Sequence, residues 1–520
     1  MFILLAGPRR GPYHGAMSSE APDEIGSFPR FDLMRRTAGL FAGPLVFAVV
    51  LLLPLGLAPP AHRLAAIFAL VIVLWISEAI PLAATALLGP TLAVLLGLAP
   101  ADQAFAPLGD KIIFLFMGSF IIARAMALHG IDRRIALFVL SRRWVGENPA
   151  RILLAFGLVA AGLSMWMSNT ATTAMMLPIG VGVLRTLSGF QGKDEASSRR
   201  YGAALLLMIA FACSIGGLAT PVGTPPNLIA KGMLERGFGW EISFFRWMCF
   251  GVPISLLCLT TLYLILRACC GSMKGLGCGA TEVFRQERAS LGRWNAGERA
   301  ALASFLVAVV LWVLPGLAPL ALGSDSDLSK ILEKRLPESA VAVLAALPLF
   351  FIPIEWRKRR FALAWRDAVA IDWGTILLFG GGLSLGNLAS STGLAQAIGD
   401  TIARASGNLP GWGFVLLAVF VAIFMTEFMS NTATVNLLVP IFIGIAKGMA
   451  AEPRLPVLGA TLGCSLAFCL PVSTPPNAIV YSSGHVTLLH MLRAGVLLDL
   501  ACGFTVWGVL LLLARFAGIP

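Results

Sequence analysis

A short polar motif occurs twice in this chain, both times inside long apolar stretches. Ser168-Asn169-Thr170-Ala171-Thr172 returns as Ser430-Asn431-Thr432-Ala433-Thr434. Each copy is followed by a Thr-Pro-Pro-Asn segment, first at residues 224–227 and again at 474–477, so the two halves are nearly in register. Polar breaks in apolar sequence are costly at membrane depth unless they share a polar cavity. We therefore expect these four segments, called here the four breaks, to meet in one site.

The composition is that of a membrane protein. Of the 520 residues, 58% are apolar and 13% are charged, and the mean hydropathy is +0.84, which is typical of integral membrane proteins. The apolar stretches are long and continuous, which favours α-helical spans over a β-barrel. A net charge of +12 can indicate nucleic-acid binding, but the basic residues lie in short loops, as the positive-inside rule predicts. No nucleic-acid partner is therefore expected.

The apolar stretches predict about eleven transmembrane helices, two of them broken, and two re-entrant helical hairpins. The hairpins are residues 152–184 and 415–446, with one Ser-Asn-Thr motif at each tip, and the broken helices are 201–233 and 457–483. The remaining spans are predicted at 39–57, 62–80, 82–98, 112–128, 250–266, 302–318, 341–354, 373–388 and 494–516. Two further helices, 129–144 and 392–406, are expected to lie on opposite membrane surfaces.

The charged loops predict the orientation of the chain. Basic residues gather in four loops that fall on one side of the predicted spans, whereas the loop 324–337 carries acidic residues and falls on the other side. The basic loops are 133–151, 193–200, 267–299 and 357–366. The N-terminus is therefore predicted to be cytoplasmic and the C-terminus to lie outside. Apart from the first span, each half has an odd number of spans, so the repeats are inverted. The predicted fold class is an all-α polytopic membrane protein of the inverted-repeat transporter type.

The residue types at the breaks suit an anion bound together with small cations. Ser, Asn and Thr cap helix N-termini, so each hairpin tip should direct free N–H groups and a positive dipole end into the cavity. The Pro-Pro pairs are expected to stop the broken helices and to free carbonyl groups near Gly223 and Ser473 for a cation. Because the four breaks contain no Arg or Lys, a bound dianion would need co-bound cations to neutralise it. Symport of anion and cation follows from this.

Other interpretations of the polar residues are less favoured. Ser and Thr often hydrogen-bond within membrane helices, but two copies in register argue against a purely structural role. Glu427, three residues before the second motif, is either a binding or a packing residue, and Glu78 is expected to be structural. The Phe379-Gly380-Gly381-Gly382 segment indicates close helix packing. An anion channel or a membrane sensor is the alternative from another class, although a channel would need a continuous polar path. No enzyme activity is predicted, because no nucleophile–base pair or metal cluster accompanies the motifs.

Taken together, the motifs resemble the divalent anion/sodium symporter family, which contains sodium-coupled di- and tricarboxylate and sulfate transporters. The resemblance covers residues 35–515 and rests on the four breaks, on Trp75–Pro81 with Thr85, and on residues 379–382. Both Ser-Asn-Thr motifs end in Thr, as in the carboxylate branch, whereas sulfate carriers tend to have Ser in the second copy. The resemblance thus implies sodium-coupled symport of C4-dicarboxylates such as succinate, malate or fumarate. A sodium-independent dicarboxylate exchanger and a sulfate or tricarboxylate symporter are the alternatives.

The resemblance also implies ligand residues. The first sodium ion would be bound by Ser164, Ser168, Asn169 and Gly223. The second would be bound by Thr426, the backbone carbonyl of Met429, Asn431 and Ser473. The substrate carboxylates would meet Asn169, Thr170, Asn431, Thr432, Thr474 and Pro475. The presence of Ser164 and Thr426 argues against sodium-independent exchange.

The implied organisation is a homodimer in the plasma (inner) membrane, in which each protomer moves a transport domain past a fixed scaffold. A cytoplasmic tail, 1–37, precedes a scaffold made of residues 38–144 and 299–408. The transport domain consists of residues 145–270 and 409–520, and a basic cytoplasmic linker, 271–298, joins the halves. The two surface helices would connect scaffold and transport domain as arms.

Overall fold

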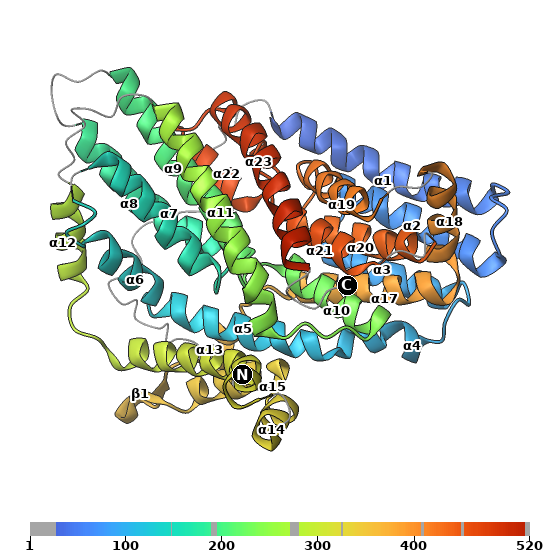
Figure 1. The fold of residues 1–520 in the computed structure, drawn as a ribbon, viewed down its shortest axis with the longest axis horizontal. Helices are drawn as coiled ribbons and strands as arrows, with labels where there is room; N and C mark the ends of the chain where they lie inside the picture. Colours follow the sequence, from blue (N-terminus) through green and yellow to red (C-terminus); the bar gives the residue numbers. More distant parts are fainter. Residues whose placement is uncertain are drawn as a thin grey trace, which may run out of the picture.

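The computed structural model describes residues 28–146, 148–188, 195–270, 280–323, 326–406, 410–448 and 452–514, and these are almost entirely helical (Figure 1). The first half contains α1 (Phe28–Leu52), α2 (Pro59–Ser77), α3 (Leu82–Leu95), α4 (Ala101–Phe105), η1 (Ala106–Gly109), α5 (Lys111–Leu128), α6 (Ile131–Leu140), α7 (Pro149–Ser164), α8 (Asn169–Ser188), α9 (Glu195–Gly217), α10 (Pro225–Phe238), α11 (Phe244–Cys270) and α12 (Ala280–Ser290).

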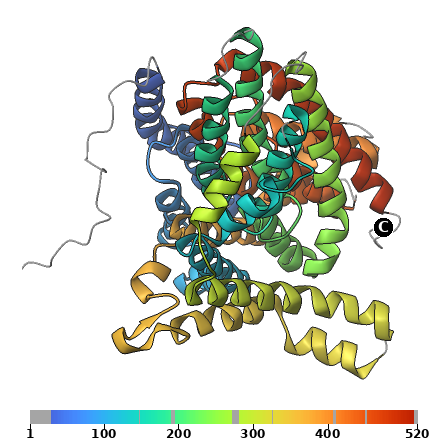
Figure 2. The ribbon, with the colours of Figure 1, turned by 90° about the vertical axis from the view of Figure 1, so that its left-hand side faces the viewer.

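The second half contains α13 (Ala296–Leu322), α14 (Asp327–Arg335), α15 (Glu338–Ala346), η2 (Leu347–Phe350), β1 (Pro353–Glu355), η3 (Trp356–Lys358), β2 (Arg360–Phe361), α16 (Trp365–Ala368), α17 (Trp373–Ser391), α18 (Leu394–Ser406), α19 (Gly411–Thr426), α20 (Asn431–Gly448), α21 (Arg454–Gly463), α22 (Pro475–Ser482) and α23 (Leu488–Ala514). The two strands pair as one small antiparallel hairpin. Together with α13, α14 and α15, this hairpin forms a layer along one edge of the molecule (Figures 1 and 2).

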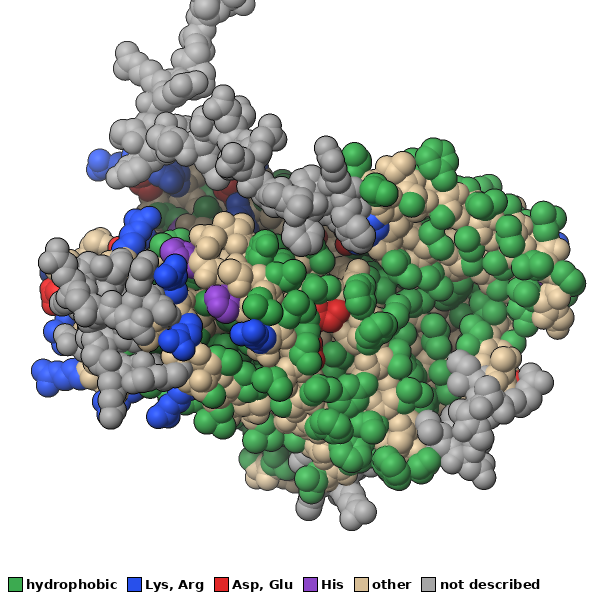
Figure 3. Space-filling view, turned by 90° about the horizontal axis from the view of Figure 1, so that it is seen from above, with side chains coloured by type: hydrophobic (Ala, Val, Ile, Leu, Met, Phe, Trp, Pro, Cys, Tyr) green, Lys and Arg blue, Asp and Glu red, His purple; other side chains and the backbone are tan. Residues whose placement is uncertain are grey.

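Many of the helices are suited to a membrane. Among the described residues, seven helices are long and apolar enough to span one, and four shorter apolar helices accompany them. The seven are Leu33–Leu52, Pro59–Ser77, Ala101–Leu128, Ser197–Gly217, Phe244–Cys270, Ala296–Leu322 and Leu488–Leu512. Hydrophobic side chains cover most of the face in Figure 3, and Lys and Arg gather at one end of it. These features agree with the predicted multi-pass membrane protein.

The broken helices occupy the interior of the molecule. In α9, 94% of the most apolar stretch is buried inside the protein, whereas only 17% of the most apolar stretch of α13 is buried. An apolar helix that stays exposed suits contact with lipid, and one that is enclosed forms a core. The core is therefore built around the segments that carry the breaks, and α13 lies at the periphery.

The two halves of the chain are interlocked. The α5 helix of the first half packs against α15 of the second, and α17 of the second half packs against α3 of the first. Glycines make both approaches close: Gly118 lies against the backbone of Ala342, and Gly381 lies against the carbonyl of Ala86. A side chain at Gly381 would collide with that carbonyl, which confirms the packing role predicted for residues 379–382.

Several predicted boundaries need correction. The tail predicted at 1–37 lies mostly outside the described residues, but α1 already begins at Phe28, so its last part is helical. The linker 271–298 is outside the described residues at 271–279 and then forms α12, rather than a loop throughout. The loop 324–337 contains α14, in which Lys334 and Arg335 follow the acidic first turn. Favourable charges at both helix ends explain why this polar segment is helical.

The two expected surface helices are present as α6 and α18. In α6, Ile131, Ala136 and Leu137 are buried while Arg133 is exposed, as the amphipathic pattern predicts. In α18, Leu394 and Ala395 are buried, and Gly399 lies against the backbone of Gly444 in α20. Along the chain, α6 precedes α7 and α18 precedes α19, which are the first helices of the two predicted hairpins.

Candidate functional site

The four breaks meet in one cavity. Its volume is about 620 Å³, and residues from both halves of the chain line it. The lining residues from the breaks, together with Gly223 and Ser473 just before two of them, are Ser168, Asn169, Thr170, Ala171, Gly223, Thr224, Pro225, Ser430, Asn431, Thr432, Ser473, Thr474, Pro475 and Pro476. All six predicted substrate-binding residues are in this wall. A space of this size falls in the range of small-molecule sites.

Four helices begin at the cavity wall. The first residues of α8, α10, α20 and α22 are Asn169, Pro225, Asn431 and Pro475, and all four residues line the cavity. The expectation that the Pro-Pro pairs stop helices is therefore wrong: they start α10 and α22, because Pro is favoured in the first turn, where an N–H is not needed. The preceding helices already end at Gly217 and Gly463. Four helix N-termini give the cavity a positive potential that suits an anion.

The first hairpin tip holds a cluster of oxygen atoms. The Ser164 hydroxyl donates to Asn169 Oδ1 at 2.6 Å. A β-carbon on Gly223 would lie 2.6 Å from the carbonyl oxygen of Gly217 and 3.0 Å from that of Met165, so only glycine fits there. Hydroxyl, amide and carbonyl oxygens of this kind are the ligands that hard cations prefer. The structure thus brings together Ser164, Asn169 and Gly223 of the first predicted sodium set, while Ser168 lies at the cavity wall.

The second hairpin tip repeats this arrangement. The Thr426 hydroxyl lies 2.8 Å from Asn431 Oδ1 and 2.7 Å from the carbonyl oxygen of Cys464. The Ser473 hydroxyl donates to the Leu470 carbonyl at 2.6 Å. The Met429 side chain is buried in a separate apolar cluster, which leaves its backbone as the group available to an ion. In each tip the amide oxygen faces a hydroxyl, which leaves the amide nitrogen to donate elsewhere.

The last residue of each Thr-Pro-Pro-Asn segment has a role that the sequence interpretation missed. The side-chain amide of Asn227 donates to the carbonyl oxygens of Gly217 and Thr220, at 2.9 and 2.8 Å. The amide of Asn477 donates to those of Ala467 and Leu470, at 3.0 and 3.1 Å. Each asparagine is fully buried. It satisfies two carbonyls that the helix break has released, and the repetition of Asn in both segments was the signal for this role.

The cavity also contains two charged residues from outside the breaks. Arg124, on α5, and Asp372, before α17, both line it. Asp372 caps α17 by accepting from the Thr375 N–H at 3.0 Å, whereas Arg124 Nε is buried and has no hydrogen-bond partner in the described part of the chain. A lone arginine inside an apolar span is a functional candidate. The predicted span 112–128 contains Arg124, and this signal was overlooked.

Ion pairs join α10 to α15, to α5 and to Asp110, the residue just before α5. The pairs are Lys231–Glu338, Arg236–Asp110 and Lys111–Glu235. Lys231 is 6% exposed, so its charge is almost wholly buried. About 20 Å of helix axis separates Lys111 from Arg124. The α10 helix therefore contributes to the cavity with its first residue and to an ion-pair cluster with its last turns.

Comparisons with known proteins agree with this architecture. A model of the sodium:sulfate symporter transmembrane region matches residues 34–514. The sodium-dependent dicarboxylate transporter SdcS of Staphylococcus saprophyticus is 35% identical over 471 residues, which cover 89% of this chain and 88% of the relative. SdcS of Staphylococcus aureus is 34% identical over the same coverage.

Two solved structures share the fold. The YdaH transporter of Alcanivorax borkumensis has a TM-score of 0.53 and 15% identity, and the match covers 94% of this chain and 98% of that one. MtrF of Neisseria gonorrhoeae, from a class of antimetabolite efflux pumps, has a TM-score of 0.54 and 13% identity, with 89% and 97% covered. Both are membrane transporters, which agrees with an all-α multi-pass transporter fold. Because the family model spans nearly the whole chain and curated transporters match it at about a third identity, this chain belongs to the sodium:sulfate symporter family.

Proposed function

We propose that this protein is a sodium-coupled symporter of C4-dicarboxylates such as succinate, malate and fumarate. The observation that carries the proposal is that the four breaks, which come from both halves of the chain, line one cavity at which four helices begin. Relatives about a third identical are named sodium-dependent dicarboxylate transporters. The cavity is large enough for a four-carbon acid, and its wall supplies hydroxyls, amides and helix N-termini for two carboxylates.

The charges in the cavity support coupling to a cation. A dicarboxylate brings two negative charges, and the four breaks contribute no basic side chain. Arg124 supplies one positive charge, but Asp372 in the same wall offsets it. Two sodium ions would neutralise the dianion in a site of low dielectric, where unpaired charges are costly. We assign one ion to Ser164, Ser168, Asn169 and Gly223, and the other to Thr426, the Met429 carbonyl, Asn431 and Ser473.

Asn169 and Asn431 would connect the ions to the substrate. The oxygen of each amide faces a hydroxyl at its hairpin tip, so it can bind the ion, and the nitrogen can donate to a carboxylate. Thr170, Thr432, Thr474 and Pro475 would complete the substrate contacts. Each ion would then strengthen anion binding, and the anion would strengthen ion binding, which is the reciprocity that symport requires.

Transport would proceed by sliding of a transport domain, residues 145–270 and 409–520, against a scaffold, residues 38–144 and 299–408. Arg124 and residues 370–372 line the cavity. Arg124 precedes the predicted cytoplasmic loop 133–151, and residues 370–372 follow the predicted cytoplasmic loop 357–366. We infer that the structure faces inward, with α10 held to the scaffold on the outer side by the ion pairs of Lys231 and Arg236. Sliding would break these pairs. The plasma-membrane location, cytoplasmic N-terminus, outer C-terminus and homodimeric state belong to the same proposal.

Uptake of radiolabelled succinate into proteoliposomes tests the coupling. We expect uptake with a sodium gradient and little uptake when choline replaces sodium. Asn169→Ala and Asn431→Ala should each abolish uptake, whereas Gln286→Ala should not, because this exposed amide on α12 donates to Glu282 at 3.2 Å and does not line the cavity. Equal uptake in sodium and choline would favour the sodium-independent exchanger. Transport of sulfate or citrate in preference to succinate would redirect the substrate assignment.

A crosslink tests the movement. Asp110→Cys with Arg236→Cys, in a background without other reactive cysteines, places one thiol just before α5 and one on α10. Oxidation should stop uptake and reduction should restore it, because the two helices belong to different domains. Undiminished uptake by fully crosslinked protein would exclude the sliding mechanism and leave local opening of the hairpin tips.

A further inference from the structure

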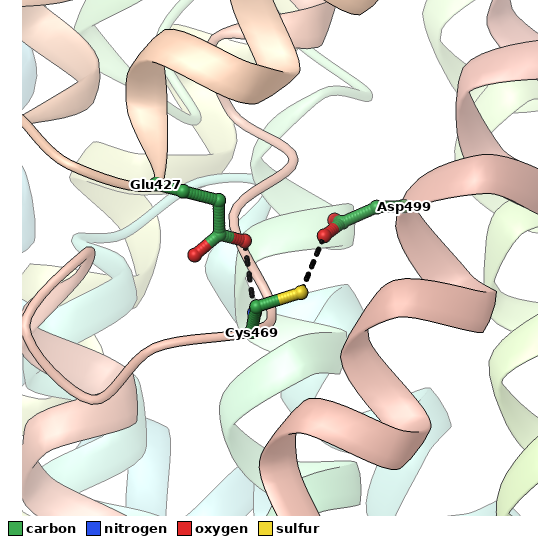
Figure 4. A group of neighbouring side chains, drawn as sticks. All are labelled: Glu427, Cys469 and Asp499. Carbon is green, nitrogen blue, oxygen red and sulfur yellow. Dashed lines mark hydrogen bonds between the residues drawn. The ribbon is translucent and has the colours of Figure 1, made fainter.

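A group of buried acidic and thiol side chains lies beside the second Ser-Asn-Thr motif, residues 430–432, but does not line the cavity (Figure 4). Glu427 follows α19, Cys469 lies between α21 and α22, and Asp499 lies on α23. The three residues are 7%, 9% and 7% exposed. One oxygen of each carboxylate and the Cys469 Sγ atom all lie within 4.8 Å of one another. We call these three residues the acid pocket.

The hydrogen bonds of the acid pocket leave one oxygen unused. Glu427 accepts the backbone N–H groups of Cys469 and Leu470, at 2.8 and 3.1 Å. The Cys469 thiol donates to Asp499 Oδ2 at 3.0 Å. Asp499 Oδ1 is buried, points into the pocket with the rest of the carboxylate (Figure 4), and has no hydrogen-bond partner among the residues that the structure describes.

The acid pocket also lacks a basic residue. No Lys or Arg in the described ranges forms an ion pair with Glu427 or Asp499. Two N–H donors favour the ionised form of Glu427. Two carboxylates this close and away from water stay ionised together only when a positive charge lies beside both groups, and without one a carboxyl takes up a proton instead. The unused oxygen of Asp499 is the position at which such a charge would bind.

The first repeat provides an internal comparison. The register of the Ser-Asn-Thr motifs pairs Glu427 with Met165, and that of the Thr-Pro-Pro-Asn segments pairs Cys469 with Ala219. In α23, a β-carbon on Gly495 would lie 2.5 Å from the Phe468 carbonyl oxygen, and in α11 one on Gly251 would lie 2.7 Å from that of Leu218. Because the two close approaches are equivalent, Gly495 of α23 corresponds to Gly251 of α11.

This alignment pairs Asp499 with Ser255, one turn after the glycine in each helix. Ser255 donates to the Ile215 carbonyl at 2.9 Å and needs no further partner. The same helix packing is therefore built in the first repeat with Met, Ala and Ser in place of Glu, Cys and Asp. Since the packing does not require the acids, their presence in the second repeat points to a ligand.

We propose that Glu427 and Asp499 bind one small monovalent cation of the sodium class, in addition to the ions assigned to the two hairpin tips. The proposal rests on the proposed function, because that function makes sodium the ion available to the site. Carboxylate oxygens are ligands for hard cations, whereas a thiol is a soft ligand, so Cys469 orients Asp499 rather than binding the ion. The cation would lie between α19 and α23 and would move with the transport domain.

Equilibrium binding of radioactive sodium to the purified full-length protein, without dicarboxylate, tests the proposal. We expect the wild type to bind one sodium ion more per chain than Asp499→Asn or Asp499→Ser, which takes the residue of the first repeat. Ser255→Ala, at the matched position, should bind as many ions as the wild type. In proteoliposomes, the Hill coefficient for sodium activation of uptake should fall in the two Asp499 variants.

The possible results separate the two proposals. Equal numbers of sodium ions in wild type and Asp499→Asn overturn the acid-pocket site, even if the variants differ in pH dependence. Binding of no more than two sodium ions per wild-type chain, the number assigned to the hairpin tips, also overturns the acid-pocket site. This result does not depend on whether any variant folds. Absence of sodium binding and of sodium-stimulated uptake in the wild type would instead refute the proposed function.

Discussion

Replacement of Asn227 by Ala should strongly destabilise the protein, although this residue does not line the cavity. Its amide is buried and donates to the carbonyl oxygens of Gly217 and Thr220 at 2.9 and 2.8 Å. A buried polar group left without its partner costs about 1–3 kcal/mol. Loss of both donors should therefore lower the free energy of unfolding by about 2–6 kcal/mol, a large part of the stability of a typical domain. Sodium-dependent uptake should be lost as well, because these carbonyls set the shape of the segment between α9 and α10.

Unfolding of the purified protein in detergent, followed by tryptophan fluorescence during titration with denaturant, measures this change. Asn227→Leu keeps most of the volume and removes the donors, so it should resemble Asn227→Ala. Asn477→Ala should show a loss of similar size, because its amide makes the equivalent pair of bonds. Gln286→Ala removes an exposed amide and should change stability by no more than about 0.5 kcal/mol. If Asn227→Ala and Asn227→Leu both unfold like the wild type, the two carbonyls do not depend on this amide and the reasoning is wrong.

Three further predictions follow from other contacts. Arg124→Gln should raise the KM for succinate at least about tenfold, since a hydrogen bond to a charged group is worth about 1.5–3 kcal/mol. Sodium should still stimulate uptake by this variant. An unchanged KM would remove Arg124 from the site. Lys231→Met should lower the free energy of unfolding by about 3–5 kcal/mol, because it leaves Glu338 without its partner, and adding Glu338→Gln should recover part of the loss in a double-mutant cycle. Burial raises the pKa of Asp132 on α6 above its ordinary value of 3.8, so the free energy of unfolding falls as the pH rises from 3.8 through the raised pKa. Asp132→Asn should therefore raise the unfolding temperature at neutral pH, and the gain should shrink as the pH falls towards 3.8; a gain independent of pH would contradict this cause.

The local sequence was enough to predict much of the site. Ser168–Thr170 and Ser430–Thr432 are polar residues in apolar surroundings, and their repetition in register pointed to a common cavity before any contact was known. Hydropathy predicted the helices because the cost of placing polar backbone and side chains in an apolar environment is a local property. The same reasoning overlooked Arg124, although a single charge in an apolar span is also a local signal.

The tertiary structure decided the features that depend on residues far apart in the chain. Pro225 and Pro475 start helices rather than stopping them, because the preceding helices end earlier and the cavity accepts the new N-termini. Glu427 and Asp499 become neighbours only because Gly495 lets α23 approach the backbone of Phe468 and Cys469, between α21 and α22. Hydropathy and motif spacing describe each segment by itself, whereas the position of a charge depends on which helices pack together. The sequence alone therefore determined which segments are broken and polar, and the packing of the helices determined which charges those segments meet.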